Sequence, residues 1–235
     1  MRRSRIAVLA GALGALGIFD ILLGPALIHA GVVSPMFGFQ WLFGLGLLEA
    51  MAGLAVGLAA LYLTRTGAGL GGRGFAWVGV GSGLAAVALL VLALRPGADL
   101  PAINDITTDL DDPPHFAATD RDMSYPAERF APQQRAAYPD LEPIRVSSAP
   151  DRALVLARET AESLGWEIVS VDPAAGRLEA REVSRIFRFV DDVVVRVRPA
   201  AAGAVIDVRS RSRDGRGDLG VNAKRIRAFA AAVPR

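Results

Sequence analysis

The strongest constraint on this chain is a series of three long apolar stretches in its amino-terminal part. We place them at Ile6–His29, Phe37–Leu63 and Phe75–Leu94. Crossing the hydrocarbon core of a bilayer takes about 20 helical residues, and each stretch is at least that long. The ionisable side chains within them and their loops are only Asp20, His29, Glu49, Tyr62, Arg65 and Arg73. The sequence therefore predicts three transmembrane helices within residues 1–94.

The first stretch also resembles a secretory signal peptide, because it follows the basic segment MRRSR. It is longer than the apolar region of such a peptide, it contains Asp20, and a second span follows at once. We therefore expect an uncleaved first helix.

The arginines around the spans are unevenly distributed. Arg2, Arg3 and Arg5 precede the first span, Arg65 and Arg73 lie between the second and third, and the loop HAGVVSPM has no Lys or Arg. Basic loops remain on the cytoplasmic side of a membrane. We expect an integral protein of the bacterial cytoplasmic (inner) membrane, with a cytoplasmic amino terminus and a periplasmic carboxy-terminal domain. Membrane lipids are then its first expected partners.

Small residues recur at helical spacing in all three spans, which predicts that the helices approach one another closely. These residues are Gly11, Gly14 and Gly17, then Gly53 and Gly57, and finally Gly79 and Gly83.

Two carboxyls lie inside the predicted spans. Asp20 is about 22 Å of helix from Arg5, and Glu49 is about 24 Å from Arg65, so the two could meet. Two adjacent carboxyls in a low dielectric do not both ionise. Two interpretations remain open: neutral groups that only specify helix packing, or a pair that handles protons or ions.

Beyond the third span charged residues become frequent, which is typical of a water-soluble domain. Residues 95–147 contain eight prolines and an excess of acids, which predicts an extended arm without long helices. Residues 148–235 predict a helix at about 150–164, two β-hairpins, and a final amphipathic helix in DLGVNAKRIRAFAAAV. The expected fold is a soluble two-layer α+β domain with about four antiparallel strands flanked by two helices.

The last predicted strand, AVIDVRSRSR, places several arginines on one face. Because side chains alternate along a strand, Arg209, Arg211 and Arg213 point the same way. With Asn222 and Arg225 of the last helix and the Gly-rich turn before it, they form a candidate anion-binding site. The alternatives are a solvated face and a helix start that is capped by Asp218 itself.

Charge is separated along the carboxy-terminal part. Residues 99–142 have ten acids and three bases, a net −7, and residues 177–235 have fourteen bases and seven acids, a net +7. The arm could therefore fold against the basic sheet and neutralise it, which would leave no external anion site. The acids expected to pair in this way are Asp105, Asp109, Asp112 and Asp218.

Other functional classes have little support in the sequence. His115 is the only histidine outside the spans and cysteine is absent, which disfavours zinc. No GxSxG, phosphate-loop or CxxC motif occurs, so we predict no catalytic residue, metal or cofactor. The near-neutral domain and its expected compartment disfavour nucleic acid.

Three functions remain open. The first is binding of an anionic envelope component, either a lipid headgroup or a cell-wall carboxylate or phosphate. The second is a hydrolase or transferase that uses Asp105, Asp109 or Asp192 beside the arginines. The third is a structural or interaction module, for example with a membrane protein partner.

Three segments carry a resemblance to a known family: INDITTDLDDPPHF, LGWEIV, and RFVDDVVVRVRP followed by GAVIDVRSRSRDGRGDLGVNAKRIRAF. From about Pro101 to Val233 the chain resembles the domain-of-unknown-function 1499 family. The resemblance implies that a membrane anchor can precede the domain. It implies no activity, cofactor or catalytic residue.

Overall fold

A computed structural model of the protein describes residues 2–65, 70–119 and 121–235, so part of the loop between the second and third spans lies outside the described residues. The chain divides into two compact units. The first contains the chain up to Arg95 together with Arg185–Arg188, and the second contains Pro96–Ser184 and Phe189–Arg235.

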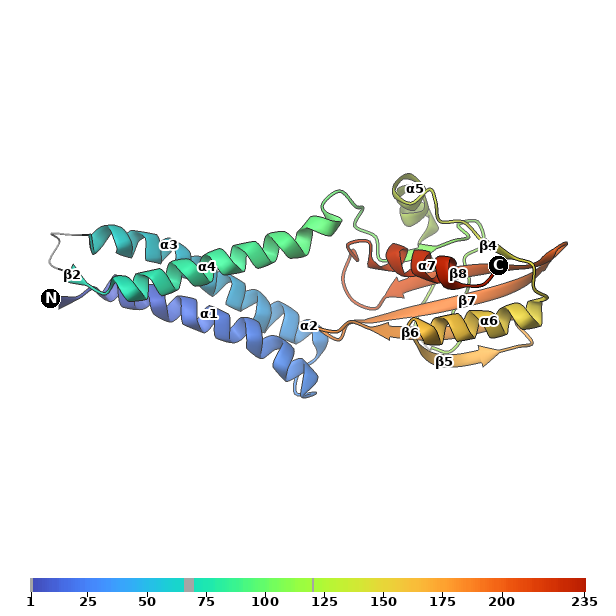
Figure 1. The fold of residues 1–235 in the computed structure, drawn as a ribbon, viewed down its shortest axis with the longest axis horizontal. Helices are drawn as coiled ribbons and strands as arrows, with labels where there is room; N and C mark the ends of the chain where they lie inside the picture. Colours follow the sequence, from blue (N-terminus) through green and yellow to red (C-terminus); the bar gives the residue numbers. More distant parts are fainter. Residues whose placement is uncertain (1, 66–69, 120) are drawn as a thin grey trace. The chain divides into compact units, whose positions relative to one another are not determined.

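The first unit is a bundle of three long helices that lie side by side (Figure 1). Its elements are β1 (Arg2–Arg3), α1 (Arg5–His29), α2 (Pro35–Phe37), the π-helical turn η1 (Gly38–Phe43), α3 (Gly44–Leu63), β2 (Leu70–Gly71) and α4 (Arg73–Leu94). Three segments are long and apolar enough to cross a membrane: Arg5–His29, Pro35–Leu63 and Arg73–Gly97. The three predicted spans are therefore confirmed as apolar helices.

Glycines allow these helices to approach closely, as the sequence predicts. A Cβ atom on Gly79 would lie 2.6 Å from the carbonyl oxygen of Gly53 and 2.7 Å from that of Ala10. A Cβ atom on Gly17 would lie 2.5 Å from the backbone nitrogen of Ala50. Larger side chains at Gly17 and Gly79 would therefore force the helices apart.

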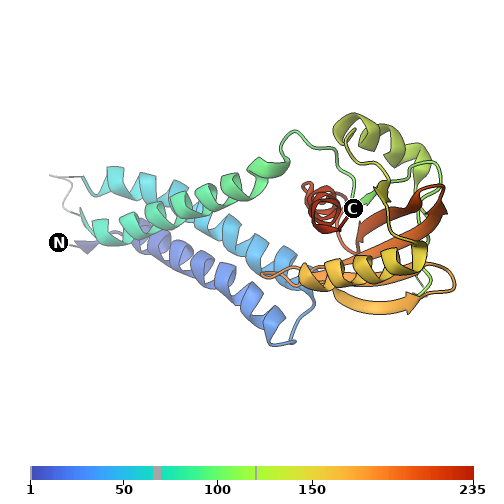
Figure 2. The same cartoon turned by 45° about the vertical axis from the view of Figure 1, so that its right-hand side comes forward.

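The second unit is built on one antiparallel sheet. Its elements are η2 (Arg95–Gly97), β3 (Asp105–Thr107), α5 (Ala127–Ala137), β4 (Ile144–Val146), α6 (Pro150–Ser163), β5 (Glu167–Asp172), β6 (Arg177–Val183), β7 (Val190–Ala200), β8 (Gly203–Ser212) and α7 (Val221–Ala232). The strand order is β3-β8-β7-β6-β5, and β4 also pairs with β8. Helices α6 and α7 lie on the same face of the sheet (Figures 1 and 2).

Both predicted hairpins and both predicted helices are present. Pro150 occupies the first turn of α6, and Gly165 follows its end with a φ of +84°, which favours glycine. Strand β5 pairs with β6, and β7 pairs with β8, both in antiparallel orientation as expected for hairpins. Strand β6 ends at Val183, and the residues from Ser184 to Phe189 form the loop that connects it to β7.

The arm contains more regular structure than predicted. The sheet has six strands rather than about four, because β3 and β4 of the arm both pair with β8. The arm also contains the eleven-residue helix α5, which forms in spite of Pro132. Phe130, Ala131 and Gln134 are buried on one face of this helix. The free energy gained by burying that face outweighs the loss of the one backbone hydrogen bond that a proline cannot donate.

The apolar core lies between the sheet and the two helices. Val193, Val195, Ile206 and Val208 are fully buried and point to this side, where α7 contributes Phe229. The ring of Phe229 stacks on Trp166 with centroids 5.3 Å apart. The alternate residues of β7 and β8 point to the opposite face, which residues 109–119 and 121–124 of the arm cover through the contacts described next.

Candidate functional site

A buried ion pair lies at the centre of the face that the arm covers. The Arg209 guanidinium donates to both carboxylate oxygens of Asp105 at 2.8 and 2.7 Å. Their side chains are 0% and 1% exposed. Arg209 also donates to the carbonyl oxygens of Pro114 and Met123 at 3.1 and 2.7 Å. One arginine of β8 therefore binds β3 and two separate points of the arm.

Two aromatic rings complete the surroundings of Arg209. The centroids of the Phe116 and Tyr125 rings lie 5.2 and 5.3 Å from its Cζ atom, within cation–π range. Burial raises the pKa of the Tyr125 hydroxyl well above its usual range. The guanidinium is therefore enclosed by carboxylate, carbonyl and aromatic groups of the protein itself.

A second group of ion pairs lies beside the first. Arg196 donates to Asp112 at 2.8 Å and to Asp109 at 3.2 Å. Arg198 donates to Asp109 at 3.0 Å and to both oxygens of Asp207, at 2.7 and 3.0 Å. The acids that the sequence analysis assigned to arginine pairing in the arm, Asp105, Asp109 and Asp112, thus all meet arginines of the sheet.

Glu179 of β6 fixes the arm from a third strand. It is 4% exposed, and one carboxylate oxygen accepts hydrogen bonds from the backbone N–H groups of Ala117 and Ala118 at 2.7 and 3.1 Å. The arm is therefore attached by its backbone as well as by its charges.

Arg211 of β8 and Arg213, which directly follows this strand, also have acceptors. Arg213 binds Asp192 through two hydrogen bonds of 2.8 and 2.6 Å. Arg211 is less completely neutralised: its nearest carboxylate, Asp105, is 3.8 Å away. It donates instead to the carbonyl oxygens of Asp122 and Ser124 at 3.2 and 3.4 Å.

Arg225 of α7 lies on the helix side of the sheet. It donates to Glu182 at 2.5 Å and to Asp191 at 2.6 Å, and it also reaches Ser210 at 2.9 Å. The Asn222 side chain accepts from Ser210 at 2.7 Å in the same cluster. Because the sheet separates this cluster from Arg209, Arg211 and Arg213, the five predicted residues do not converge on one point.

Asp218 occupies the start of α7. Its carboxylate accepts from the backbone N–H groups of Gly220 and Asn222, each at 2.9 Å. Burial raises the pKa of this carboxyl above its ordinary value. The start of α7 was a candidate site for an external anion, but the Asp218 carboxylate already contacts its backbone N–H groups. This agrees with the alternative that Asp218 itself caps the helix. Among the described residues, Asp218 pairs with these backbone groups and with no arginine.

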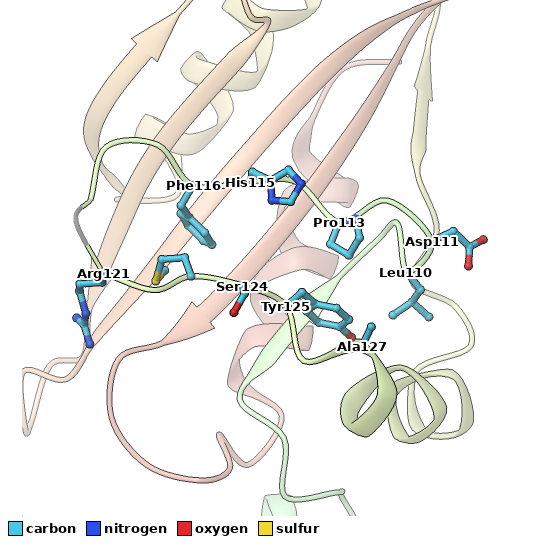
Figure 3. A pocket seen from close by; sticks show the side chains of 10 residues that line it. Leu110, Asp111, Pro113, His115, Phe116, Arg121, Ser124, Tyr125 and Ala127 are labelled. Carbon is cyan, nitrogen blue, oxygen red and sulfur yellow. The ribbon is translucent and has the colours of Figure 1, made fainter.

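The arm also forms a pocket of about 500 Å³ on its outer side (Figure 3). It is lined by Leu110, Asp111, Pro113, His115, Phe116, Arg121, Met123, Ser124, Tyr125 and Ala127. Much of this lining is apolar, and the rings of two lining residues, Phe116 and Tyr125, also lie against the guanidinium of Arg209.

Two basic side chains of the pocket differ from those of the sheet. Within the described residues, the guanidinium of Arg121 and the imidazole of His115 make no hydrogen bond or ion pair. Asp111, at the other end of the lining in Figure 3, pairs with Arg135 at 2.9 Å. The sequence analysis named His115 only as a poor zinc ligand and missed the pocket, because an irregular loop without periodicity builds it.

In the first unit the structure brings Asp20 and Glu49 together. Their carboxyl groups lie close enough to interact electrostatically. Gly46 provides the space, because a Cβ atom there would lie 3.0 Å from the Cβ atom of Asp20. One carboxylate oxygen of Glu49 is buried without a partner among the described residues. Whether the pair handles protons or only specifies packing stays a prediction.

The comparisons with known proteins agree with the resemblance. A family model described as "Protein of unknown function (DUF1499)" matches residues 105–233, more than half of the 235 residues. The match begins at β3, so it includes the arm as well as the hairpins and α7. No curated protein matches the chain.

The buried pair predicts a large difference between two aspartates of the arm. Asp105→Ala leaves the Arg209 guanidinium buried without its carboxylate, which costs about 3–5 kcal/mol of unfolding free energy. Asp111→Ala is the matched control. The Asp111 side chain is 90% exposed, so its ion pair with Arg135 contributes only about 0–1 kcal/mol of unfolding free energy. Urea unfolding of residues 96–235 measures both. Equal losses for the two variants would contradict this assignment.

Proposed function

The chain belongs to the DUF1499 family of proteins of unknown function, and we propose that it is a membrane-anchored binding protein. Its ligand would be an amphiphilic anion, with an apolar body and a phosphate or carboxylate group. The site would be the pocket of the arm rather than the arginine-rich strand.

The observation that carries this proposal is the contrast between two sets of basic side chains. On the sheet, Arg196, Arg198, Arg209 and Arg213 bind carboxylates within 3.2 Å, so an external anion would have to displace acids of the protein. Arg121 borders the pocket, and its guanidinium makes no hydrogen bond or ion pair with the residues that the structure describes. An anion that enters the pocket can bind it without displacing another group.

The lining suits a ligand with an apolar part. Phe116, Met123 and Tyr125 offer an aromatic and apolar wall. Arg121 lies at one end of the lining, and His115 lies nearer its middle, between Phe116 and Pro113 (Figure 3). Arginine suits phosphate and carboxylate because its planar guanidinium donates two parallel hydrogen bonds. An acyl-bearing anion fits this wall better than a water-soluble cell-wall fragment does.

Arg211 has a supporting role in this proposal. Two of the five residues predicted for anion binding contact the segment that lines the pocket: the fully buried Arg209, and Arg211, which donates to the carbonyl oxygens on either side of Met123. The Arg211 side chain is 29% exposed. Arg211 would hold the lip of the pocket and add positive charge there.

The enzyme alternative has no comparable support. The three carboxylates that it needs are all engaged: Asp105 with Arg209, Asp109 with Arg196 and Arg198, and Asp192 with Arg213. If the protein binds none of the probes in the titration below, the result would favour a purely structural or interaction module.

We expect Arg121→Gln to weaken binding of a short-chain anionic lipid about 10- to 100-fold, because one charge-assisted contact contributes about 1.5–3 kcal/mol. The full-length protein, labelled through Glu128→Cys at an exposed position next to the pocket lining, would be titrated in nanodiscs with dioctanoyl phosphatidic acid. Dioctanoyl phosphatidylcholine and a soluble muropeptide serve as zwitterionic and cell-wall probes. Fluorescence of the label measures each affinity.

The matched control for this titration is Arg129→Gln, because Arg129 is an exposed arginine of α5 outside the pocket lining. It should leave the affinity unchanged. Equal binding of the two lipids, or equal affinity of the wild type and Arg121→Gln, would rule out the pocket as an anion site. Preference for the muropeptide would identify the cell wall as the source.

The proposed orientation places the pocket in the periplasm, with the amino terminus in the cytoplasm. It rests on Arg2, Arg3 and Arg5 before the first span and on Arg65 and Arg73 between the second and third. Alkaline phosphatase fused after Arg235 should therefore be active, and a fusion after Arg65 inactive. The reverse pattern would place the domain in the cytoplasm and remove the envelope ligand.

A further inference from the structure

The loop between β6 and β7 combines exposed apolar and basic side chains. Its sequence from Ser184 to Phe189 is Ser-Arg-Ile-Phe-Arg-Phe. Two hydrogen bonds close it: the Ser184 N–H donates to the carbonyl oxygen of Phe189 at 2.8 Å, and the Phe189 N–H donates to the Ser184 hydroxyl at 2.9 Å. We call Arg185–Arg188, the residues enclosed by these bonds, the hairpin tip.

The hairpin tip presents an apolar side chain that the protein leaves uncovered. Ile186 is 61% exposed, more than Val155, Val169 or Leu219 of the second unit, which are 44%, 47% and 46% exposed. Leaving a large aliphatic side chain at the end of a hairpin unburied costs free energy, unless another apolar phase receives it.

The charge of the hairpin tip is not neutralised locally. Within the described residues, Arg185 and Arg188 have no ion pair or side-chain hydrogen bond. The nearest acids along the chain are Glu182 and Asp191, and both bind Arg225. The tip therefore carries two free positive charges on either side of Ile186 and Phe187.

Two further observations point to a bilayer. Arg185–Arg188 belong to the same compact unit as the membrane-spanning helices. Within that unit the Phe187 ring lies edge-on to Phe39 and Phe43, with centroids 5.0 Å apart in both cases. Phe39 and Phe43 lie near the first residues of the second span, where aromatic side chains gather at a membrane–water interface.

The tether to the third span is short. Helix α4 ends at Leu94, and Gly97 already packs against Leu219 in the second unit, where a Cβ atom on Gly97 would lie 2.5 Å from a Cδ atom of Leu219. Only two residues separate these points along the chain, so the connection between the helix and the domain is at most a few residues long.

We propose that the hairpin tip binds the surface of an anionic bilayer, with Ile186 in the headgroup–acyl boundary and Arg185 and Arg188 at lipid phosphates. Apolar insertion combined with basic side chains is how proteins bind a membrane interface. This contact does not depend on the pocket, because it needs neither Arg121 nor His115. It would fix one face of the domain toward the lipid.

The absence of cysteine allows a direct test on the full chain. Ile186→Cys and, as a matched control, Val169→Cys would each be spin-labelled in nanodiscs of phosphatidylcholine, with and without phosphatidylglycerol. Power-saturation measurements compare accessibility to oxygen, which concentrates in lipid, and to a water-soluble nickel complex. We expect position 186 to favour oxygen, more strongly with phosphatidylglycerol, and position 169 to favour nickel.

A second variant isolates the charge. Arg185→Gln/Arg188→Gln in the Ile186→Cys background should lower the equilibrium constant for insertion about fivefold per arginine in anionic nanodiscs. Three outcomes would overturn the proposal: nickel access at 186 in both lipids, protection of 186 from both reagents, as by a protein partner, or no effect of the double substitution.

Discussion

The ion pair between Arg209 and Asp105 joins two parts of the domain that lie 104 residues apart in the sequence. It joins the last strand to the first, and the same guanidinium binds two carbonyl groups of the arm. A buried arginine without these acceptors would be strongly unfavourable, so the sheet requires the arm as a third layer. Helix α7 on the other face also contacts the arm directly, through Arg227 with Asp140 and through Asn222 with the carbonyl oxygen of Asn104.

The ion pairs change how the arginine-rich strand should be understood. A row of arginines on one face of a strand is typical of an anion site, but here aspartates of the arm and of the sheet bind them. What remains for a ligand is the outer side of the arm, where Arg121 and His115 lie beside an apolar wall. In this account the arm has two faces, a charged one that binds the sheet and an apolar one that forms the pocket.

The sequence predicted those parts of the structure whose side chains follow a period. The three spans, both hairpins, α6, α7 and the common face of Arg209, Arg211 and Arg213 all came from spacing alone. The charge difference between the arm and the later strands also predicted that the two would pair.

The arm itself could not be predicted in the same way. Strands β3 and β4 have three residues each, too few for alternation to be recognised. Helix α5 contains Pro132, and its buried Gln134 is held by Thr107, which is remote in sequence. The pocket lies on an irregular loop, and its shape follows from where Arg209 and Glu179 hold that loop.

The central claim is that the arm is an integral layer of the domain rather than a tether. Removing it would expose the unpaired edge of β8 and leave Arg209 without Asp105. The most direct test compares the urea unfolding of residues 96–235 with that of residues 148–235. We predict that the longer segment unfolds in one cooperative transition and that the shorter one is insoluble or lacks such a transition. Equal stability of the two segments would contradict the account.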